Sequence, residues 1–382
     1  MAVARRLFMG WLFTLKTIAG DKGVLIILAL APLIYGFFYP WPYGTQTVTQ
    51  VPVAVVDLDH TSLSRQLTRF ARASPHLNVR LVTGDESAAQ QALWSGEVEG
   101  YVVLPRDLKR NVLRGSPAVV TVQANGAYAL LNKAVLTGFS ESIGTVSAGV
   151  ELMKLQVAGQ SALQAAVNRS PIGTQTVALF NPTQGYGSFV VPAVALLILQ
   201  QTLLMGVGML VGLWTETGFQ RTDAATWVGR LLAFCTVGYA NGLLYFGWIF
   251  WLQDFPRGGN PGGALLLLAC YIPAVCSMGA LLGLWFGNRE RALQVLLFTA
   301  LPAIFVSGFS WPEEALPEVL QGARWLLPST AGIQASLKLN QMGAPVSDVS
   351  ALLAILVGLA LFSAALLLRL ANPPSGKKTE NN

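Results

Sequence analysis

Apolar stretches long enough to cross a membrane recur along the chain. A helix needs about 20 apolar residues to span the roughly 30 Å hydrocarbon core of a bilayer. Six segments meet or approach this length: residues 23–39, 189–214, 228–252, 264–287, 293–310 and 351–370. The first and fifth are the shortest, and they carry Pro32 and Pro302, respectively. The pattern therefore predicts a polytopic α-helical membrane protein with six transmembrane helices.

The long segment between the first two predicted helices has a different, mostly polar pattern. Residues 51–57 form a β-branched run that is typical of a buried strand, and residues 62–73 place Leu63 and Leu67 on one helical face. Further strands are predicted at 78–83, 100–105 and 118–123, with short helices between them. The segment 42–188 is thus expected to form an α/β extracytoplasmic domain inserted between transmembrane helices 1 and 2.

The last part of this insert predicts a long amphipathic helix. Apolar residues recur every three or four positions from Leu131 to Val157, which is the helical period. Glycine weakens a helix by about 1 kcal/mol relative to alanine. The glycines of this stretch therefore count against a single unbroken rod: Gly138, Gly144, Gly149 and Gly159.

The sequence DLDHTS at residues 57–62 resembles a catalytic or metal-binding site, because it holds two carboxylates beside a histidine. One histidine without a second cluster of ligands makes a poor metal site. We interpret the motif as a strand end followed by a helix N-cap, with Asp59 or Thr61 accepting backbone N–H groups. We predict no catalytic residue and no metal site on this chain.

Composition supports the membrane interpretation. Hydrophobic residues make up 53% of the 382 residues and charged residues 12%, against about 25% charged in ordinary globular proteins. So few charges cannot cover the surface of a soluble fold, and disordered chains are richer in charge. The net charge of +6 comes mostly from basic residues beside the apolar segments or on the insert, so we expect no nucleic-acid partner.

Basic residues predict the orientation, because Lys and Arg are enriched in cytoplasmic loops. With the N-terminus in the cytoplasm, the short inner segments hold 11 basic residues, including Arg5, Arg221 and Arg289, and the short outer loops hold three. The C-terminus then also lies in the cytoplasm, and the insert lies outside. Trp214 and Trp227 fall at inner helix ends, where tryptophan forms interfacial belts.

The sequence lacks the motifs of an ATPase and of an ion-coupled carrier. No G-x-x-x-x-G-K-[ST] phosphate loop occurs, so the chain is not expected to hydrolyse ATP by itself. No Asp, Glu or Lys lies in the middle of a predicted span, whereas ion-coupled carriers use such residues at the midplane. Two alternatives stay open: an ion-coupled secondary transporter or channel, and a membrane receptor that senses a ligand with its insert.

Three stretches resemble the permease subunits of bacterial type-2 ABC exporters with a large periplasmic domain. They are VPVAVVDLDHTSLSRQL at 51–67, LFNPTQGYGSFVVPAVALLILQQ at 179–201 and SGFSWPEEALPEVLQGARWLLPSTAGIQASLKLNQMGA at 307–344. The resemblance covers most of the chain and implies three parts. These are an N-terminal amphipathic helix with transmembrane helix 1 at 1–41, a periplasmic α/β domain at 42–188, and a five-helix transmembrane domain at 189–382 with an outer hairpin at 310–350.

The resemblance also implies functional residues. In this family the loop after the second transmembrane helix docks on a separate ATP-binding subunit, which here assigns the coupling loop to Glu216, Thr217, Gly218 and Arg221. A candidate substrate path along the second and fifth helices comprises Gln200, Gln201, Met205, Phe298, Phe305 and Phe309. ATP and Mg²⁺ would bind to the partner ATPase, and no cofactor is expected on this chain.

The function implied is that of the permease subunit of an ATP-driven exporter in the bacterial inner membrane. Its substrate would be hydrophobic or amphiphilic, such as a drug or a lipid, because the predicted passage lacks fixed charges. The expected partners are an ATP-binding subunit and a second permease copy or paralogue. A periplasmic membrane-fusion adaptor and an outer-membrane channel are implied by similar systems.

Overall fold

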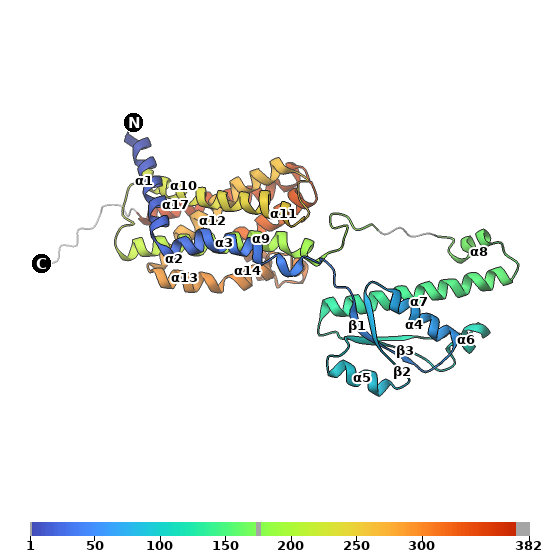
Figure 1. The fold of residues 1–382 in the computed structure, drawn as a ribbon. Helices are drawn as coiled ribbons and strands as arrows, with labels where there is room; N and C mark the ends of the chain where they lie inside the picture. Colours follow the sequence, from blue (N-terminus) through green and yellow to red (C-terminus); the bar gives the residue numbers. More distant parts are fainter. Residues whose placement is uncertain (1, 173–176, 372–382) are drawn as a thin grey trace. The chain divides into compact units, whose positions relative to one another are not determined.

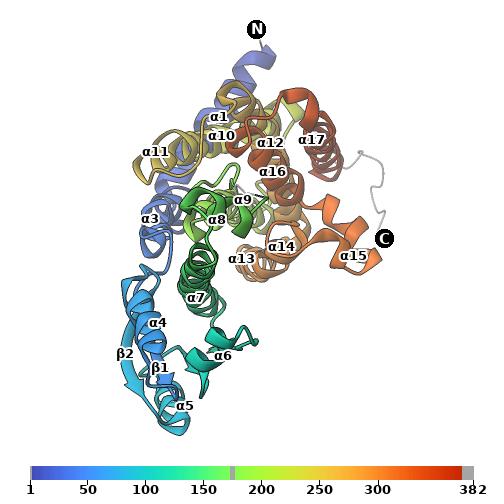
Figure 2. The same ribbon diagram turned by 90° about the vertical axis from the view of Figure 1, so that its right-hand side faces the viewer.

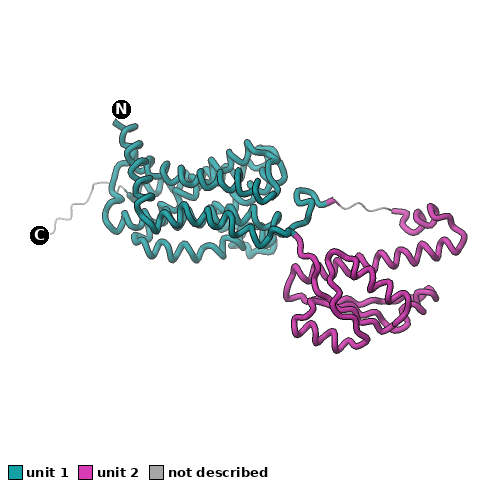
Figure 3. The backbone as a smooth tube through the Cα atoms, viewed as in Figure 1, with its two compact units in different colours: residues 1–46, 178–382 teal, residues 47–177 magenta. Residues whose placement is uncertain are grey.

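The computed structural model describes residues 2–172 and 177–371. The chain separates into two compact units, shown in Figure 3. One contains Met1–Gln46 together with Ala178–Asn382 and is called the membrane unit below; the other contains Thr47–Val177 and is called the α/β unit. Their elements are labelled in Figure 1.

Long apolar helices form most of the membrane unit. After α1 (Ala2–Gly20), the described residues contain five helical stretches that are long and apolar enough to cross a membrane: Lys22–Tyr43, Tyr186–Glu216, Ala224–Leu252, Pro261–Phe286 and Val346–Ala371. The first comprises α2 (Lys22–Leu25), a π-helical turn and α3 (Ala31–Phe38), and the others contain α9 (Tyr186–Glu216), α10 (Ala224–Leu243) with α11 (Phe250–Leu252), α12 (Pro261–Phe286) and α17 (Ser350–Ala371). These stretches coincide with five of the six predicted spans.

The remaining predicted span, residues 293–310, is not one continuous helix. It is divided into α13 (Arg289–Phe298) and α14 (Ala300–Val306), which meet at Thr299. Pro302 explains the break, because a proline inside a helix lacks an N–H donor and collides with the carbonyl of the preceding turn. Neither helix alone is long enough to span a bilayer. That α13 and α14 together provide a sixth crossing stays a prediction.

Helix α9 lies in the middle of the membrane unit, as Figure 2 shows. Of its most apolar window, 89% is buried, compared with 28% for the first and last spans. Its neighbours come very close: a Cβ added to Gly283 of α12 would lie 2.5 Å from the carbonyl oxygen of Gly208 of α9. Small residues at such crossings let helix backbones pack in lipid without a hydrophobic driving force.

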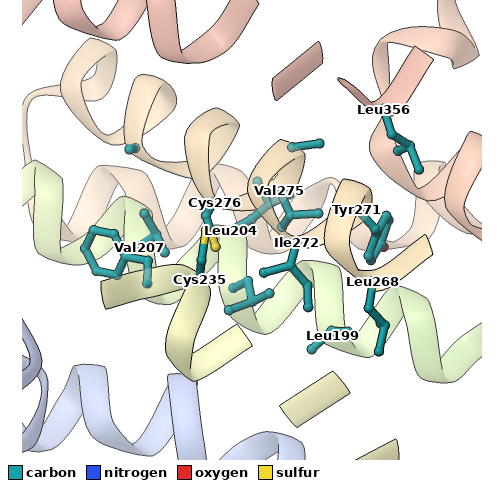
Figure 4. Packing of buried hydrophobic residues seen from close by; sticks show 14 of the residues in the cluster. Leu199, Leu204, Val207, Cys235, Leu268, Tyr271, Ile272, Val275, Cys276 and Leu356 are labelled. Carbon is teal, nitrogen blue, oxygen red and sulfur yellow. The ribbon is translucent and has the colours of Figure 1, made fainter. Parts of the chain in front are cut away.

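The α9–α12 interface continues into α10 through small apolar side chains. In Figure 4, Leu204 of α9 lies beside Val275 of α12, and the sulfur atoms of Cys235 and Cys276 lie close together between α10 and α12. Both cysteines are buried and free. They occupy packing positions inside the bundle.

The region expected to form an outer hairpin is largely helical and partly internal. Between α14 and α17 lie α15 (Glu318–Ala323), α16 (Pro328–Ser336) and a π-helical turn at Leu337–Gln341. Almost every residue of α16 is buried. A Cβ at Gly332 would lie 2.4 Å from the Tyr271 ring of α12. The small residues of α16 therefore let this short helix pack into the bundle.

The α/β unit contains a four-stranded sheet in the order β2-β1-β3-β4. The strands are β1 (Val51–Asp57), β2 (Leu77–Thr83), β3 (Gly100–Leu104) and β4 (Thr121–Ala124). Strand β1 is parallel to β2 and β3, whereas β4 is antiparallel to β3. The helices are α4 (Ser62–Ala73), α5 (Glu86–Trp94), α6 (Leu108–Arg114), α7 (Ala129–Val157) and α8 (Ala162–Arg169).

The apolar side chains of β1 point alternately to the two faces of the sheet, and helices cover both faces. Val53 and Val55 pack with α4 and α7, whereas Ala54 and Val56 pack with α5, since neighbouring side chains of a strand point to opposite faces. The patterns at 51–57 and 62–73 thus predicted β1 and α4 correctly. The last strand begins three residues later than predicted, at Thr121.

Helix α7 is continuous from Ala129 to Val157 despite its glycines. The predicted long amphipathic helix is thus a single helix, and its glycines do not interrupt it. Gly138 has a packing role, because an added Cβ would lie 2.6 Å from the Leu77 side chain of β2. The close approach of helix and sheet at this point compensates for the low helix propensity of glycine.

Candidate coupling site

The DLDHTS motif has the structural role that its pattern suggested. Asp57 accepts hydrogen bonds from the backbone N–H groups of Asp59 and His60, at 3.1 and 2.8 Å. Thr61 is the N-cap of α4. The Asp57 carboxylate and the Thr61 hydroxyl thus satisfy backbone donors at a strand-to-helix turn.

The predicted coupling loop begins where α9 ends. Thr217 is the C-cap, and its hydroxyl donates a hydrogen bond of 2.9 Å to the Leu213 carbonyl. Gly218 has φ +76° with open space around its Cβ position. Glycine is favoured here by backbone conformation rather than by lack of room. The four predicted coupling residues, Glu216, Thr217, Gly218 and Arg221, are all exposed.

The side chain of Arg230 of α10 packs against the inner side of this loop. Its guanidinium carbon lies 4.3 Å from the centroid of the Trp214 ring and 4.9 Å from those of Phe219 and Trp227. One guanidinium nitrogen donates a 3.1 Å hydrogen bond to the Phe219 carbonyl. The side chain is only 2% exposed, and its Nε and other terminal nitrogen have no hydrogen-bond partner. Three aromatic faces therefore hold a buried cation under the loop.

The two tryptophans of this cage differ from their predicted role. Trp214 and Trp227 are 4% and 0% exposed, so they do not form an interfacial belt. Trp227 instead donates a 3.0 Å hydrogen bond from its indole N–H to the Gln220 carbonyl. The available sequence signal was Arg230 inside the predicted span 228–252 with aromatic residues close by, because an arginine within a span is rare and needs a partner.

Helix α1 packs against both the loop and α10. The Phe13 ring lies 5.2 Å from the Phe219 ring. Added Cβ atoms at Gly10 and Gly229 would collide with backbone oxygens of α10 and α1, respectively. The predicted N-terminal amphipathic helix is thus in close contact with α10, and it contacts the loop through Phe13.

A chain of polar contacts connects the end of α9 to two other elements. The Asn288 amide donates a 3.2 Å hydrogen bond to the Glu216 carboxylate. The next residue, Arg289, makes two hydrogen bonds of 2.5 and 2.7 Å with the Asp21 carboxylate. Asp21 also caps α2 by accepting a hydrogen bond from Val24 N–H. The coupling loop, the start of α13 and the start of the first span therefore meet at one end of the bundle.

Electrostatics favour the ionised state of this pair. The hydrogen bond from Arg289 lowers the pKa of Asp21 below its usual value of 3.8, and the same bond raises the pKa of Arg289. The side chains are 18% and 27% exposed, so solvent screens the pair only in part. Sequence reasoning missed Asp21 as a partner because 268 positions separate the two residues.

The residues predicted to line a substrate path differ in how deeply they are buried. Gln200 and Gln201 of α9 are buried within the chain's own bundle. Gln201 donates hydrogen bonds of 3.2 Å to the Leu296 carbonyl and the Thr299 hydroxyl, where α13 is interrupted. It therefore connects α9 to the break between α13 and α14.

The other predicted path residues lie closer to the surface of the unit. Phe298 and Phe305 are 80% and 55% exposed. They belong to an apolar outer face of α13 and α14 that also includes Leu297 and Leu301. Met205 and Phe309 are partly buried. The substrate path as a whole stays a prediction.

Long apolar helices with largely exposed apolar faces define this chain as a multi-pass membrane protein. The family model described as ABC-2 family transporter protein matches residues 22–369. The chain therefore belongs to the ABC-2 transporter family. Membership identifies it as a transport subunit and implies a separate ATP-binding subunit as its partner.

Several curated relatives resemble the chain over most of its length. It is 21% identical over 323 residues to the probable multidrug ABC transporter permease YbhS of Escherichia coli K12, with 82% of each chain covered. It is 21% identical over 373 residues to the linearmycin resistance permease protein LnrN of Bacillus subtilis 168, covering 89% of this chain and 92% of the relative. It is 22% identical over 375 residues to the inner membrane transport permease YhhJ of Escherichia coli K12, covering 92% and 94%.

Proposed function

We propose that this chain is the permease subunit of an ATP-driven ABC exporter, and that the loop from Glu216 to Asp223 receives the ATP-binding subunit. The observation that carries this proposal is the Arg230 cage. The loop is exposed on its outer side, while its Phe219 and Gln220 carbonyls are fixed to α10 from below. Because the loop is anchored in this way, a movement of the docked partner can be transmitted through it to α9, α10 and α1 without a change in the conformation of the loop.

The substrate we propose is a hydrophobic or amphiphilic compound, such as a drug or lipid. Two of the relatives are named for multidrug transport and linearmycin resistance, and the predicted spans carry no Asp, Glu or Lys in their middle. The exposed apolar face of α13 and α14 suits a second copy of the chain or a close paralogue. The substrate would then pass between the two copies, while ATP and Mg²⁺ bind to the partner ATPase.

We place the protein in the bacterial inner membrane with both termini in the cytoplasm. The α/β unit would then lie in the periplasm, where it suits contact with an adaptor that leads to an outer-membrane channel. Basic residues at the coupling end support this orientation, since Arg5, Arg221 and Arg289 belong to segments on that side of the spans.

Cysteine labelling in cells tests this orientation. In a variant in which Cys235, Cys270 and Cys276 are replaced by alanine, single cysteines at Ser95 and Glu318 are expected to react with a membrane-impermeant maleimide added outside. A cysteine at Thr222 is expected to react only after the membrane is permeabilised. Labelling of Thr222 in intact cells, with Ser95 protected, would reverse the proposed topology.

The source of energy distinguishes the exporter from an ion-coupled carrier. In vesicles that contain this chain and its ATP-binding subunit, efflux of an amphiphilic dye should require ATP and persist when an uncoupler collapses the proton gradient. The physical reason is that the span centres hold no acidic residue for a proton relay. Efflux that stops with the uncoupler while ATP stays high would contradict the proposal and favour a secondary transporter.

A further inference from the structure

A cavity of about 250 Å³ lies at the end of the membrane unit remote from the coupling loop. Its apolar lining comes from the end of the α10 stretch and the start of α12, including Phe246 and Leu268. Leu243 and Leu265, which also line it, are 51% and 56% exposed. The cavity therefore opens on the apolar surface of the bundle that faces lipid in a membrane protein.

Polar groups converge at one side of this cavity. Asn340 is 4% exposed, and its amide nitrogen has no hydrogen-bond partner. Its amide oxygen accepts a 3.3 Å hydrogen bond from Gly258 N–H, which fixes the orientation of the amide and leaves the NH₂ donors free for a ligand. Arg257 adds a cation to the same lining, with its side chain 31% exposed. One of its guanidinium nitrogens donates a 3.2 Å hydrogen bond to the Phe250 carbonyl and lies 3.7 Å from the fully exposed Asp254 carboxylate, which leaves its other nitrogens for a ligand.

The backbone around the cavity is unusual on both sides. The segments Leu244–Ile249 and Leu337–Gln341 are π-helical, and each supplies residues to the lining. π-Helical turns are rare and frequently mark functional sites. Gly247 of the first turn lines the cavity, and a Cβ added there would meet nothing within 4 Å. The wall is thus open at this point rather than filled by a side chain.

Exposed aromatic residues indicate the depth of the cavity in a bilayer. Trp248 and Trp251 are 53% and 56% exposed, and their rings lie 5.8 Å apart. Exposed tryptophans of a membrane helix prefer the level of the lipid head groups. At that level a phosphate group can reach Arg257 and Asn340, while a hydrocarbon chain extends along Leu265 toward the bilayer interior.

We propose that this cavity is a binding site for a membrane phospholipid. Its phosphate accepts hydrogen bonds from the Arg257 guanidinium and the Asn340 amide, and the first carbons of one acyl chain fill the apolar part. A volume slightly below the roughly 300–1,000 Å³ of drug-sized pockets fits part of a lipid rather than a whole ligand. The inference rests on the chain being a membrane protein and not on the proposed export.

Photolabelling with an anionic phospholipid tests the site. The full chain would be reconstituted in nanodiscs with phosphatidylglycerol that carries a diazirine on one acyl chain, and labelled peptides would be mapped by mass spectrometry. Labelling is expected to concentrate between Leu243 and Leu268. Gly247→Phe places a ring where the wall is open and should reduce the labelling about tenfold, because the ring excludes the acyl chain from the cavity.

Two further variants separate the head-group contacts from the cavity itself. Asn340→Asp keeps the acceptor for Gly258 N–H but removes the free amide donor, and Arg257→Gln removes the cation; each should reduce labelling about tenfold. Gly358→Phe is the matched control, because Gly358 is also an exposed helical glycine with nothing within 4 Å of its Cβ position. It should leave the labelling unchanged.

Two outcomes would overturn the proposal. Labelling spread evenly over all exposed helices and unchanged in Gly247→Phe would show boundary lipid only. A site that binds inorganic phosphate but is not labelled by the phospholipid would be a free-anion site. Binding is measured without ATP or transport, so failure of this proposal is distinguishable from failure of the proposed export.

Discussion

Replacing Arg230 by methionine is expected to disconnect ATP hydrolysis from this membrane subunit while leaving the fold intact. The change removes the hydrogen bond to the Phe219 carbonyl and the cation beneath three aromatic rings. Methionine still fills the buried space, and it removes two guanidinium nitrogens that have no partner, so stability should change little. The coupling loop, in contrast, loses its anchor to α10.

The measurement is the ATPase rate and co-purification of the ATP-binding subunit with the reconstituted chain. In Arg230→Met we expect the ATPase rate and the amount of co-purified ATP-binding subunit to fall at least about tenfold, since a hydrogen bond to a charged group contributes about 1.5–3 kcal/mol. Arg230→Lys should be nearly as defective, because an ammonium group cannot stack flat on three rings. Arg369→Met, at an exposed arginine of α17, is the control. Unchanged coupling in Arg230→Met would contradict the role of the cage.

Breaking the Asp21–Arg289 pair is expected to lower the stability of the membrane unit by about 1–3 kcal/mol, the cost of leaving a partly buried charge without its partner. Asp21→Asn is the most informative change, because asparagine still caps α2 but no longer carries a charge. Arg289→Gln should have a similar effect, and the double variant should be no worse than either single variant. Midpoints of thermal unfolding in detergent provide the measurement.

The pH dependence follows from the same pair. The pKa of Asp21 is lowered in the folded protein, so the contribution is fully present at neutral pH and is lost as the pH falls through this lowered pKa. The difference between the protein and Asp21→Asn should therefore be constant near pH 7 and vanish in strong acid. Additive effects of the two single changes would show that the ion pair has no role of its own.

Local patterns were sufficient to predict most elements of this chain. Runs of apolar residues located the five continuous spans, because a bilayer imposes length and composition on any helix that crosses it. The β-branched run at 51–57 and the helical period at 62–73 became β1 and α4, since each stretch matches the geometry of one element. The loop proposed for coupling was assigned by resemblance alone, and the structure shows that this loop is exposed at the end of α9.

The sequence by itself thus determined a membrane bundle with an α/β insert, because hydrophobic period and length act along the chain. Only the tertiary structure decided which side chains meet. It buried Trp214 and Trp227 around Arg230, and it paired Asp21 with Arg289 across 268 positions. The physical reason is that a pattern shows which face of an element is apolar, whereas the partner of that face, and of each charge beside it, depends on how distant helices pack.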